Sequence, residues 1–210
     1  MAEIKFKGKK FEKLKAFLKR ENAKFGKLTK KEQRLEIAHD VIALLKAERI
    51  MASSTYISFE DGADLEPCYA SEEDDYGDRV IDPAMKKIET RLLLDQLPAC
   101  EVCGIGSLFV AAVRKHDKLP ISNFLDLYNG RSDRRDSEAR YLKKWFDQDE
   151  LYDVERFFEA DADNFSEQSS PIRSQNDKSI RLVMIMENII SNGGHFKPSV
   201  GRHKDPVGSL

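Results

Sequence analysis

Apolar residues recur every three or four positions along most of the chain, which is the spacing that places them on one face of an α-helix. The segments with this pattern are 10–22, 29–49, a stretch from Pro83, 99–115, 123–128, a stretch from Ser137, a stretch from Asp147 and a stretch from Asn176 or Asp177. The pattern predicts a mainly α protein, a compact bundle of about six to eight helices.

Start and stop signals support several of these helices. Thr29 with Glu32, and Asp147 with Glu150, have the spacing of a capping box, in which two side chains satisfy free amides of the first helical turn. Gly193-Gly194 is expected to end the last helix, because glycine readily adopts the left-handed conformation that closes a helix.

The segment 99–115 is the most apolar part of the chain and is expected to form the central helix. It contains Gly104 and Gly106, and since a glycine costs a helix about 1 kcal/mol relative to alanine, we expect a packing reason for both. Gly104-Ile105-Gly106 also matches part of a phosphate-binding glycine loop, but the third glycine is missing and no strand is predicted before it. Close helix packing is therefore the preferred interpretation.

Two stretches depart from the helical pattern. Residues 53–59 contain β-branched and aromatic side chains between Ser-Ser and Asp-Gly, which predicts a minor short β element. Residues 60–82 are acidic and poor in aliphatic side chains, which predicts a long exposed loop. The expected organisation is a basic helical extension at 1–27, a helical core domain at 28–194 that carries the acidic loop, and a flexible tail at 195–210.

Charge is separated by sign along the sequence, although the whole chain has a formal net charge of -2. Residues 1–34 carry 13 basic and four acidic residues, a net charge of +9, whereas residues 60–82 carry one basic and ten acidic residues, a net charge of -9. Blocks of opposite charge attract each other, or each block attracts a different partner. The acidic candidates for a partner contact are Glu72, Glu73, Asp74, Asp75 and Asp78.

The basic block contains an amphipathic helix whose polar positions are Lys10, Lys13, Lys15, Lys19 and Arg20. Phenylalanines at 6, 11, 17 and 25 are interleaved with these cations, and a purely solvated helix would leave their rings in water. A second basic cluster consists of Arg131, Arg134, Arg135, Arg140, Lys143 and Lys144. The two clusters form one positive surface if the fold brings them together.

Three cysteines are too few for a secreted disulfide scaffold and favour a reducing compartment, with the cytoplasm as the expected location. No apolar run approaches the length needed to cross a bilayer, and no secretory signal is recognisable, so no membrane partner is expected. Cys68, Cys100, Cys103 and His116 match the ligand number of a zinc site, but burial of the cysteines as small apolar residues is the preferred interpretation. A redox role for the C-x-x-C pair is less favoured still.

No catalytic motif is recognisable among the titratable residues. His39, His116, His195 and His203 lie outside the sequence contexts of known nucleophile or metalloprotease motifs. An enzyme in which His116 or the cysteines act stays open as the third functional hypothesis, and a non-enzymatic role is preferred.

The residues Ala99–Leu108, with a capped helix before them and a helix capped at Asn176-Asp177 closing the chain, resemble a group of small bacterial and phage proteins that have a central helix rich in cysteine, glycine and small residues. This resemblance implies a prokaryotic or viral origin and carries over no catalytic residue.

The leading hypothesis is a non-enzymatic interaction protein that binds a protein or nucleoprotein partner through its segregated charges. Its most specific form is a phage or mobile-element inhibitor of a host nucleic-acid-handling or defence machine. The alternative is direct nucleic-acid binding by the basic helix and the 131–144 cluster, which must weaken steeply with salt.

Overall fold

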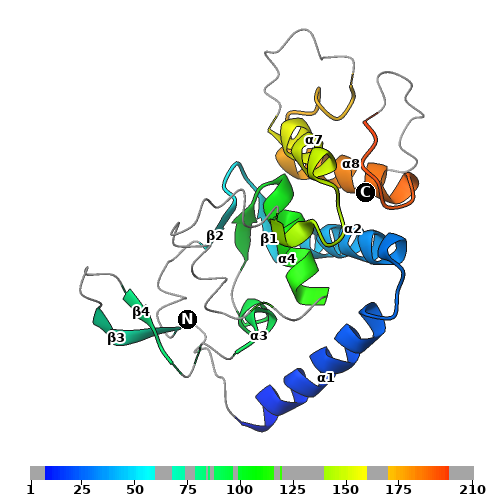
Figure 1. Cartoon of the computed structure of the whole chain (residues 1–210). Helices are drawn as coiled ribbons and strands as arrows, with labels where there is room; N and C mark the ends of the chain where they lie inside the picture. Colours follow the sequence, from blue (N-terminus) through cyan, green and yellow to red (C-terminus); the bar gives the residue numbers. More distant parts are fainter. Residues whose placement is uncertain are drawn as a thin grey trace.

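The computed structural model has a mainly helical fold with a minor β component, as the sequence predicts (Figure 1). It describes residues 8–59, 68–73, 79–83, 85, 88–96, 99–115, 119, 140–159 and 170–198. Within these residues, no helix combines the length and the apolar composition that crossing a bilayer requires.

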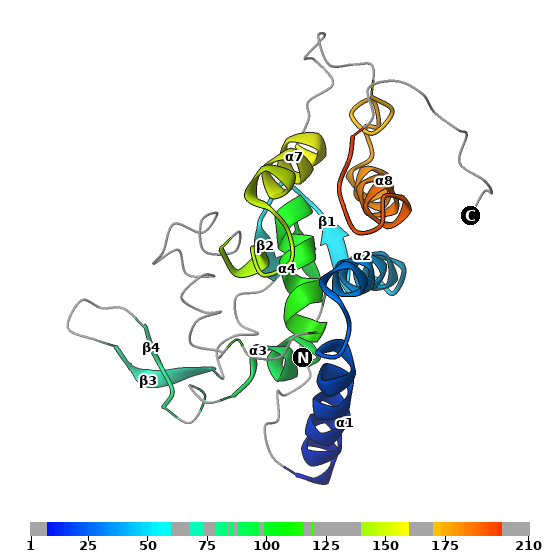
Figure 2. The ribbon, with the colours of Figure 1, turned by 45° about the vertical axis from the view of Figure 1, so that its right-hand side comes forward.

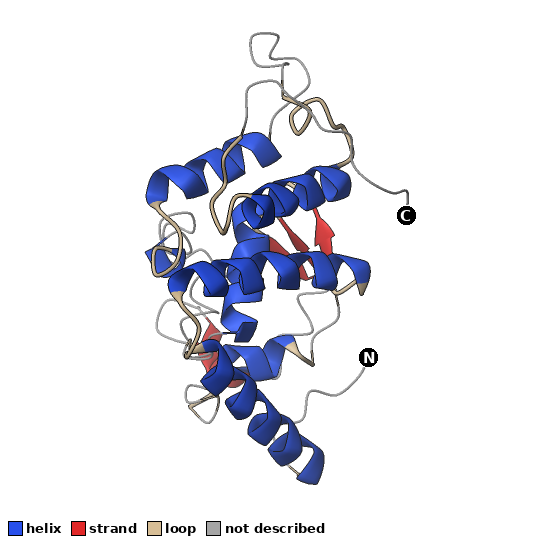
Figure 3. Ribbon diagram, turned by 90° about the vertical axis from the view of Figure 1, so that its right-hand side faces the viewer, coloured by secondary structure: helices blue, strands red, loops and turns tan. Residues whose placement is uncertain are grey.

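The central helix is α4 (Gly104–Lys115). α2 (Lys30–Lys46) packs against α4 and α8 (Lys178–Ser191), while α7 (Gln148–Phe158) packs against both α4 and α8. α1 (Lys9–Phe25) lies at the opposite end of the molecule from α7, a separation that is visible from two directions (Figures 1 and 3).

The predicted helix signals are present in the structure. Thr29 N–H donates to Glu32 Oε2 at 2.7 Å and Glu32 N–H donates to Thr29 Oγ1 at 3.3 Å, which is the capping box of α2. Asp177 Oδ1 accepts from the amides of Ser179 and Ile180 and so caps α8. Gly193 and Gly194, with φ of 67° and 95°, follow the end of this helix, as expected.

The prediction of one helix over 99–115 is wrong at its beginning. Cys100–Val102 forms β5, the central strand of a three-stranded sheet in which β1 (Ile50–Ala52) is parallel and β2 (Ile57–Phe59) is antiparallel to it. In β5 the side chains of Cys100 and Val102 are buried and Glu101 is half-buried, the alternation of a strand rather than a helix. The predicted β element at 53–59 therefore contributes one strand, β2, to a sheet whose other strands lie before it in β1 and well after it in β5.

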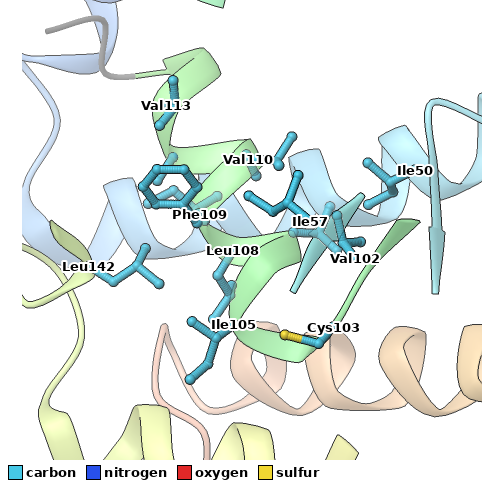
Figure 4. Close-up of a cluster of buried hydrophobic side chains, with 14 of the residues drawn as sticks. Ile50, Ile57, Val102, Cys103, Ile105, Leu108, Phe109, Val110, Val113 and Leu142 are labelled. Carbon is cyan, nitrogen blue, oxygen red and sulfur yellow. The ribbon is translucent and has the colours of Figure 1, made fainter. Parts of the chain in front are cut away.

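The sheet and α4 share one hydrophobic core (Figure 4). Ile50, Ile57 and Val102 come from the three strands, and Val110 of α4 lies next to them in the close-up. Leu142 lies near Phe109 and Leu108, on the α4 surface that these strands leave free. Ten of the 12 residues of α4 are buried, which confirms its prediction as the central helix.

The two glycines at the start of α4 are explained by packing. A Cβ at Gly106 would overlap the carbonyl oxygen of Tyr56 and lie 2.9 Å from its carbonyl carbon. A Cβ at Gly104 would lie 3.0 Å from Phe158 Cβ. Because backbone cannot yield as a side-chain end can, Gly106 is the residue that permits the turn before β2 to contact the first turn of α4.

Two further helix predictions need new boundaries. The helix expected from Pro83 begins at Thr90 instead, as α3 (Thr90–Leu94). Met85 and Ile88, which precede it, are half-buried and pack against the core, so their apolar spacing reflects burial rather than a helix. The helix expected at 123–128 lies outside the described residues.

The loop predicted at 60–82 is corrected in two parts. Tyr69–Glu73 (β3) and Arg79–Ile81 (β4) pair as antiparallel strands. The strands form because Tyr69 and Ile81, directly opposite each other in register, both pack towards the core. Residues 60–67 and 74–78 lie outside the described part of the chain.

The first four residues of the tail predicted from His195 are packed against the rest of the protein instead. Phe196 is 6% exposed and meets the ring of Phe157 edge-on, with 5.4 Å between their centroids. Its amide donates to Glu150 Oε1 at 2.5 Å, and Asn188 accepts from the amide of Lys197. Residues 195–198 therefore belong to the packed structure because a buried aromatic ring holds them.

Candidate macromolecular interface

The first helix is attached to the protein mainly by its C-terminal end. Phe25 is buried and its ring lies 6.2 Å from that of Trp145, while the carbonyl of Phe25 accepts from Gln33 Nε2 at 3.0 Å. Leu18 is the other buried residue of α1. From this attachment α1 extends beyond α3 and away from α7 and α8 (Figure 2).

All five basic residues that the sequence singles out on this helix are exposed: Lys10, Lys13, Lys15, Lys19 and Arg20. Helical geometry divides them, because each residue turns the helix by about 100°. Lys13 and Arg20 lie on the side opposite Leu18, Lys10 lies on one flank, and Lys15 and Lys19 lie on the other flank.

An exposed aromatic ring lies on the same flank as Lys10, about 100° around the helix from Leu18. Phe17 is 50% exposed, and the residues seven and four positions before it and three and seven positions after it are Lys10, Lys13, Arg20 and Lys24. Residues three or four positions apart are neighbours on a helix surface, and residues seven apart lie on the same side two turns away. Glu21, four positions after Phe17, is also a neighbour, and it is paired with Lys24. We call Phe17 and the four cations the Phe17 face.

The structure extends this positive region beyond α1. Trp145, which contacts Phe25, also donates from Nε1 to Gln33 Oε1 at 2.9 Å. Its neighbours Lys143 and Lys144 are exposed, so the described part of the second basic cluster lies beside the corner between α1 and α2. The basic surface comprises the exposed residues Lys9, Lys10, Lys13, Lys15, Lys19, Arg20, Lys24, Lys27, Lys30, Lys31, Arg140, Lys143 and Lys144.

Few acidic residues offset these 13 cations. Residues 8–32 and 140–145 contain three, Glu12, Glu21 and Glu32, of which Glu32 takes part in the capping box of α2. Glu21 forms an ion pair with Lys24 at 2.7 Å, and this hydrogen bond lowers the pKa of Glu21 from its ordinary value. The carboxylate of Glu21 therefore remains charged and offsets one cation. The surrounding region is still strongly positive, because the cations outnumber the carboxylates.

Sequence reasoning did not select Lys24, Lys27, Lys30 and Lys31 as site residues, nor Phe17 as distinct from the other phenylalanines. Phe25 is buried and Phe11 is half-buried, while Phe6 lies outside the described residues. Sorting the helix by its angular positions would have found the Phe17 face, because Leu14, Leu18 and Phe25 mark the buried side and Phe17 lies outside the arc that they span.

The other predicted contact residues are placed only in part. Glu72 and Glu73 lie in β3. Asp74, Asp75 and Asp78 lie outside the described residues, and so do Arg131, Arg134 and Arg135 of the second basic cluster.

The cysteines are not gathered into one site by the described structure. Cys100 is paired across the sheet with Ile50 and Phe59, whereas Cys103 Sγ accepts from the amide of Gly106 at 3.3 Å at the start of α4. Burial raises the pKa of the Cys68 thiol to about 11 and that of Cys100 to about 12, which disfavours the thiolate that binds metal. Among the described residues, no three histidine, cysteine or acidic side chains are grouped to hold a metal ion. His116 is not among them.

A phosphate-binding glycine loop follows a strand, and the structure has such a strand, β5, directly before the glycines of α4. Whether the start of α4 can bind phosphate therefore depends on what its amides contact. Glu155 Oε2 accepts from the amide of Ile105 at 3.3 Å, and the amide of Gly106 donates to Cys103 Sγ. A carboxylate thus occupies the position where a phosphate would accept, and Gly106 is covered by the backbone at Tyr56. Helix packing remains the explanation for these glycines.

Comparisons with protein-family models, with curated proteins and with solved structures found no match for this chain. The functional argument therefore depends on the chain's own surface.

A polar cluster at the opposite side of the fold bears on the enzyme hypothesis. Lys178 Nζ contacts Ser54 Oγ and lies 3.2 Å from Glu159 Oε2, which also accepts from Ser54 Oγ at 3.0 Å. These contacts join the turn between β1 and β2 to the end of α7 and the beginning of α8, while Glu159 Oε1 is buried without a hydrogen-bond partner among the described residues. The cluster acts as a clamp between elements, and the basic surface is the stronger functional candidate.

Proposed function

We propose that this protein is an interaction protein that binds a negatively charged region of a macromolecular partner through its basic surface. The observation that carries the proposal is the gathering of 13 exposed cations on α1, the α1–α2 corner and the 140–144 turn, beside three acidic residues. Clustered like charge opposes folding and raises the association rate with an oppositely charged partner.

The attachment of α1 supports the same proposal. A helix that only contributed to the core would bury more of its length than Leu18 and Phe25. α1 instead presents an exposed ring within a cationic face, and exposed apolar groups of this kind commonly mark interaction sites.

The acidic block supplies the finer part of the proposal. Glu72, Glu73, Asp74, Asp75 and Asp78 would contact a basic region of the partner, and in its most specific form the protein is a phage or mobile-element inhibitor of a host nucleic-acid-handling machine. Changing these five residues to their amides must weaken binding to such a partner, and unchanged binding would remove the acidic contact from the proposal.

Heparin, a soluble polyanion, tests the basic surface directly. The wild-type protein should be retained on immobilised heparin at low salt, and the Lys13→Gln/Arg20→Gln/Lys27→Gln variant should elute at a clearly lower NaCl concentration, because three contacts with the polyanion are lost.

The matched control removes three exposed cations elsewhere, as Lys46→Gln/Arg156→Gln/Lys197→Gln. It has the same net charge as the test variant and should elute near the wild type. Elution of both variants at the same salt concentration would show that net charge, and not this surface, determines binding.

A further inference from the structure

The chemistry of the basic surface also indicates which kind of polyanion it fits. We infer that the basic surface binds single-stranded nucleic acid, with Phe17 stacking on a base and the surrounding cations contacting phosphates. This inference rests on the proposed function and adds the class of partner to it.

The choice of cation is the first reason. Of the 13 basic residues of the surface, 11 are lysines and two, Arg20 and Arg140, are arginines. Protein–protein interfaces are depleted of lysine and enriched in arginine relative to the rest of the surface. A lysine ammonium is a compact charge on a flexible stem that suits phosphate oxygens without requiring a fixed geometry.

The position of Phe17 is the second reason. Lys13 and Arg20 lie about one helical turn on either side of its ring, and Lys10 and Lys24 lie about two turns away. The four cations therefore extend over about 21 Å of helix, since each residue adds about 1.5 Å. An aromatic ring between cations is the arrangement on which bases stack while phosphates are held on both sides.

Single strands fit this arrangement better than a duplex does. A duplex keeps the faces of its bases stacked on one another, so it offers phosphates to the lysines and no base face to Phe17. An unpaired strand offers both groups. The rival partner is an acidic protein with an apolar pocket for Phe17, and the experiment below separates the two.

Fluorescence anisotropy provides the test, with labelled oligo(dT), oligo(rU) and a mixed-sequence duplex, each of about 20 nucleotides or base pairs, at about 50 and 200 mM NaCl. The wild-type protein should bind the single strands more tightly than the duplex and lose affinity as salt rises. The dT and rU arms show whether the strand is DNA or RNA.

Phe17→Leu separates stacking from charge. It keeps an apolar side chain of helical preference and should weaken single-strand binding about tenfold, with duplex binding and heparin retention unchanged. Lys13→Gln/Arg20→Gln should weaken binding to both forms and reduce the salt dependence for single strands by about 1.4 in the slope of log K against log salt.

Tyr152→Leu is the matched aromatic control, because Tyr152 is 66% exposed on the distant helix α7. It should bind as the wild type does. Retention on heparin without binding to any oligonucleotide would overturn the inference and leave the proposed function standing. Equal losses by Phe17→Leu on single strands and duplex, or no loss on either, would also overturn it. Absence of both heparin and oligonucleotide binding would overturn the two proposals together.

Discussion

The helices α4 and α1 share an amphipathic sequence but use it in opposite ways. Ten of the 12 residues of α4 are buried, whereas α1 buries two of 17, so the environment of α4 is set by its neighbours and that of α1 by solvent. Residues of α4 must fit the side chains packed around them, while exposed positions on α1 are free to contact a partner. Stability is therefore expected to depend on α4 and binding on α1.

The strongest test of this difference between the helices adds a single methyl group at the start of α4 and measures stability. In Gly106→Ala, the added Cβ overlaps the Tyr56 carbonyl oxygen, and no flexible side chain is there to move aside. The free energy of unfolding should fall by about 4 kcal/mol or more, among the largest effects of single substitutions. Urea unfolding followed by circular dichroism measures it.

Gly26→Ala, at the end of α1, is the control. Its backbone has an ordinary helical φ of -65°, and the added Cβ would lie 3.4 Å from the Asn22 carbonyl oxygen. Stability should stay constant or rise by up to about 1 kcal/mol, because alanine restricts the unfolded chain more than glycine does. Similar losses for Gly26→Ala and Gly106→Ala would refute the contrast between the two helices.

Truncation of one apolar side chain in each helix gives the second largest contrast. Leu108 is fully buried, so Leu108→Ala should lower the free energy of unfolding by about 3 kcal/mol. Phe17 is half exposed, and Phe17→Ala should change it by less than about 0.5 kcal/mol. A loss above about 1.5 kcal/mol for Phe17→Ala would mean that the ring is part of the fold rather than of an interface.

Sequence patterns predicted the helices that carry their own signals. α2 and α8 have capping residues and apolar stripes within one segment, so local chemistry was enough to locate them. β5 was missed because its in–out–in alternation covers only Cys100, Glu101 and Val102, inside a run that also fits a helix. Its partners in β1 lie 50 residues earlier in the chain, and pairing at this distance leaves no local signal.

The candidate interface was predicted in composition but not in geometry. The cations of α1 were evident from the sequence, yet the exposure of Phe17 depends on which side of α1 faces the protein. The approach of the 140–145 segment depends on the contact between Phe25 and Trp145, which lie 120 residues apart. Neither contact follows from a pattern within one segment.

The reactivity of cysteine thiols measures how accessible the core around α4 and the surface of α1 are to solvent in the native protein. Cys68, Cys100 and Cys103 are buried, and burial raises the pKa of Cys100 to about 12, so all three should react very slowly with Ellman's reagent in the native protein. Guanidinium should expose all three at once. A Phe17→Cys variant should add one thiol that reacts immediately.

Fast reaction of the native wild-type protein would show that the sheet and α4 open far more readily than their packing implies. Release of zinc on unfolding would revive the metal hypothesis for these cysteines. Either result is measured in the same titration with a chromophoric chelator present.

The smallest expected effect concerns Asp40 on α2, whose side chain is 16% exposed beside the end of α4. Burial raises the pKa of Asp40; Arg114 and Lys115 oppose the rise, while Glu36 and Asp95 add to it. Because the folded state favours the protonated acid, the stability associated with Asp40 is present at low pH and falls as pH rises through its raised pKa. Asp40→Asn should therefore be slightly more stable than the wild type at about pH 7.5 and equal to it near pH 4.

Glu21 on α1 provides the opposite sign in the exposed region. Its pKa is lowered by the hydrogen bond with Lys24, so any stabilisation is present above the pKa of the unfolded state and lost as pH falls. Solvent screens this exposed pair, and Glu21→Gln should leave the urea midpoint unchanged at both pH values. The difference in midpoint between Asp40→Asn and wild type must shrink on acidification. A constant difference would mean that packing of the asparagine amide, and not the buried charge of Asp40, causes the difference in stability. Electrostatics would then no longer distinguish the interior beside α4 from the solvated helix α1.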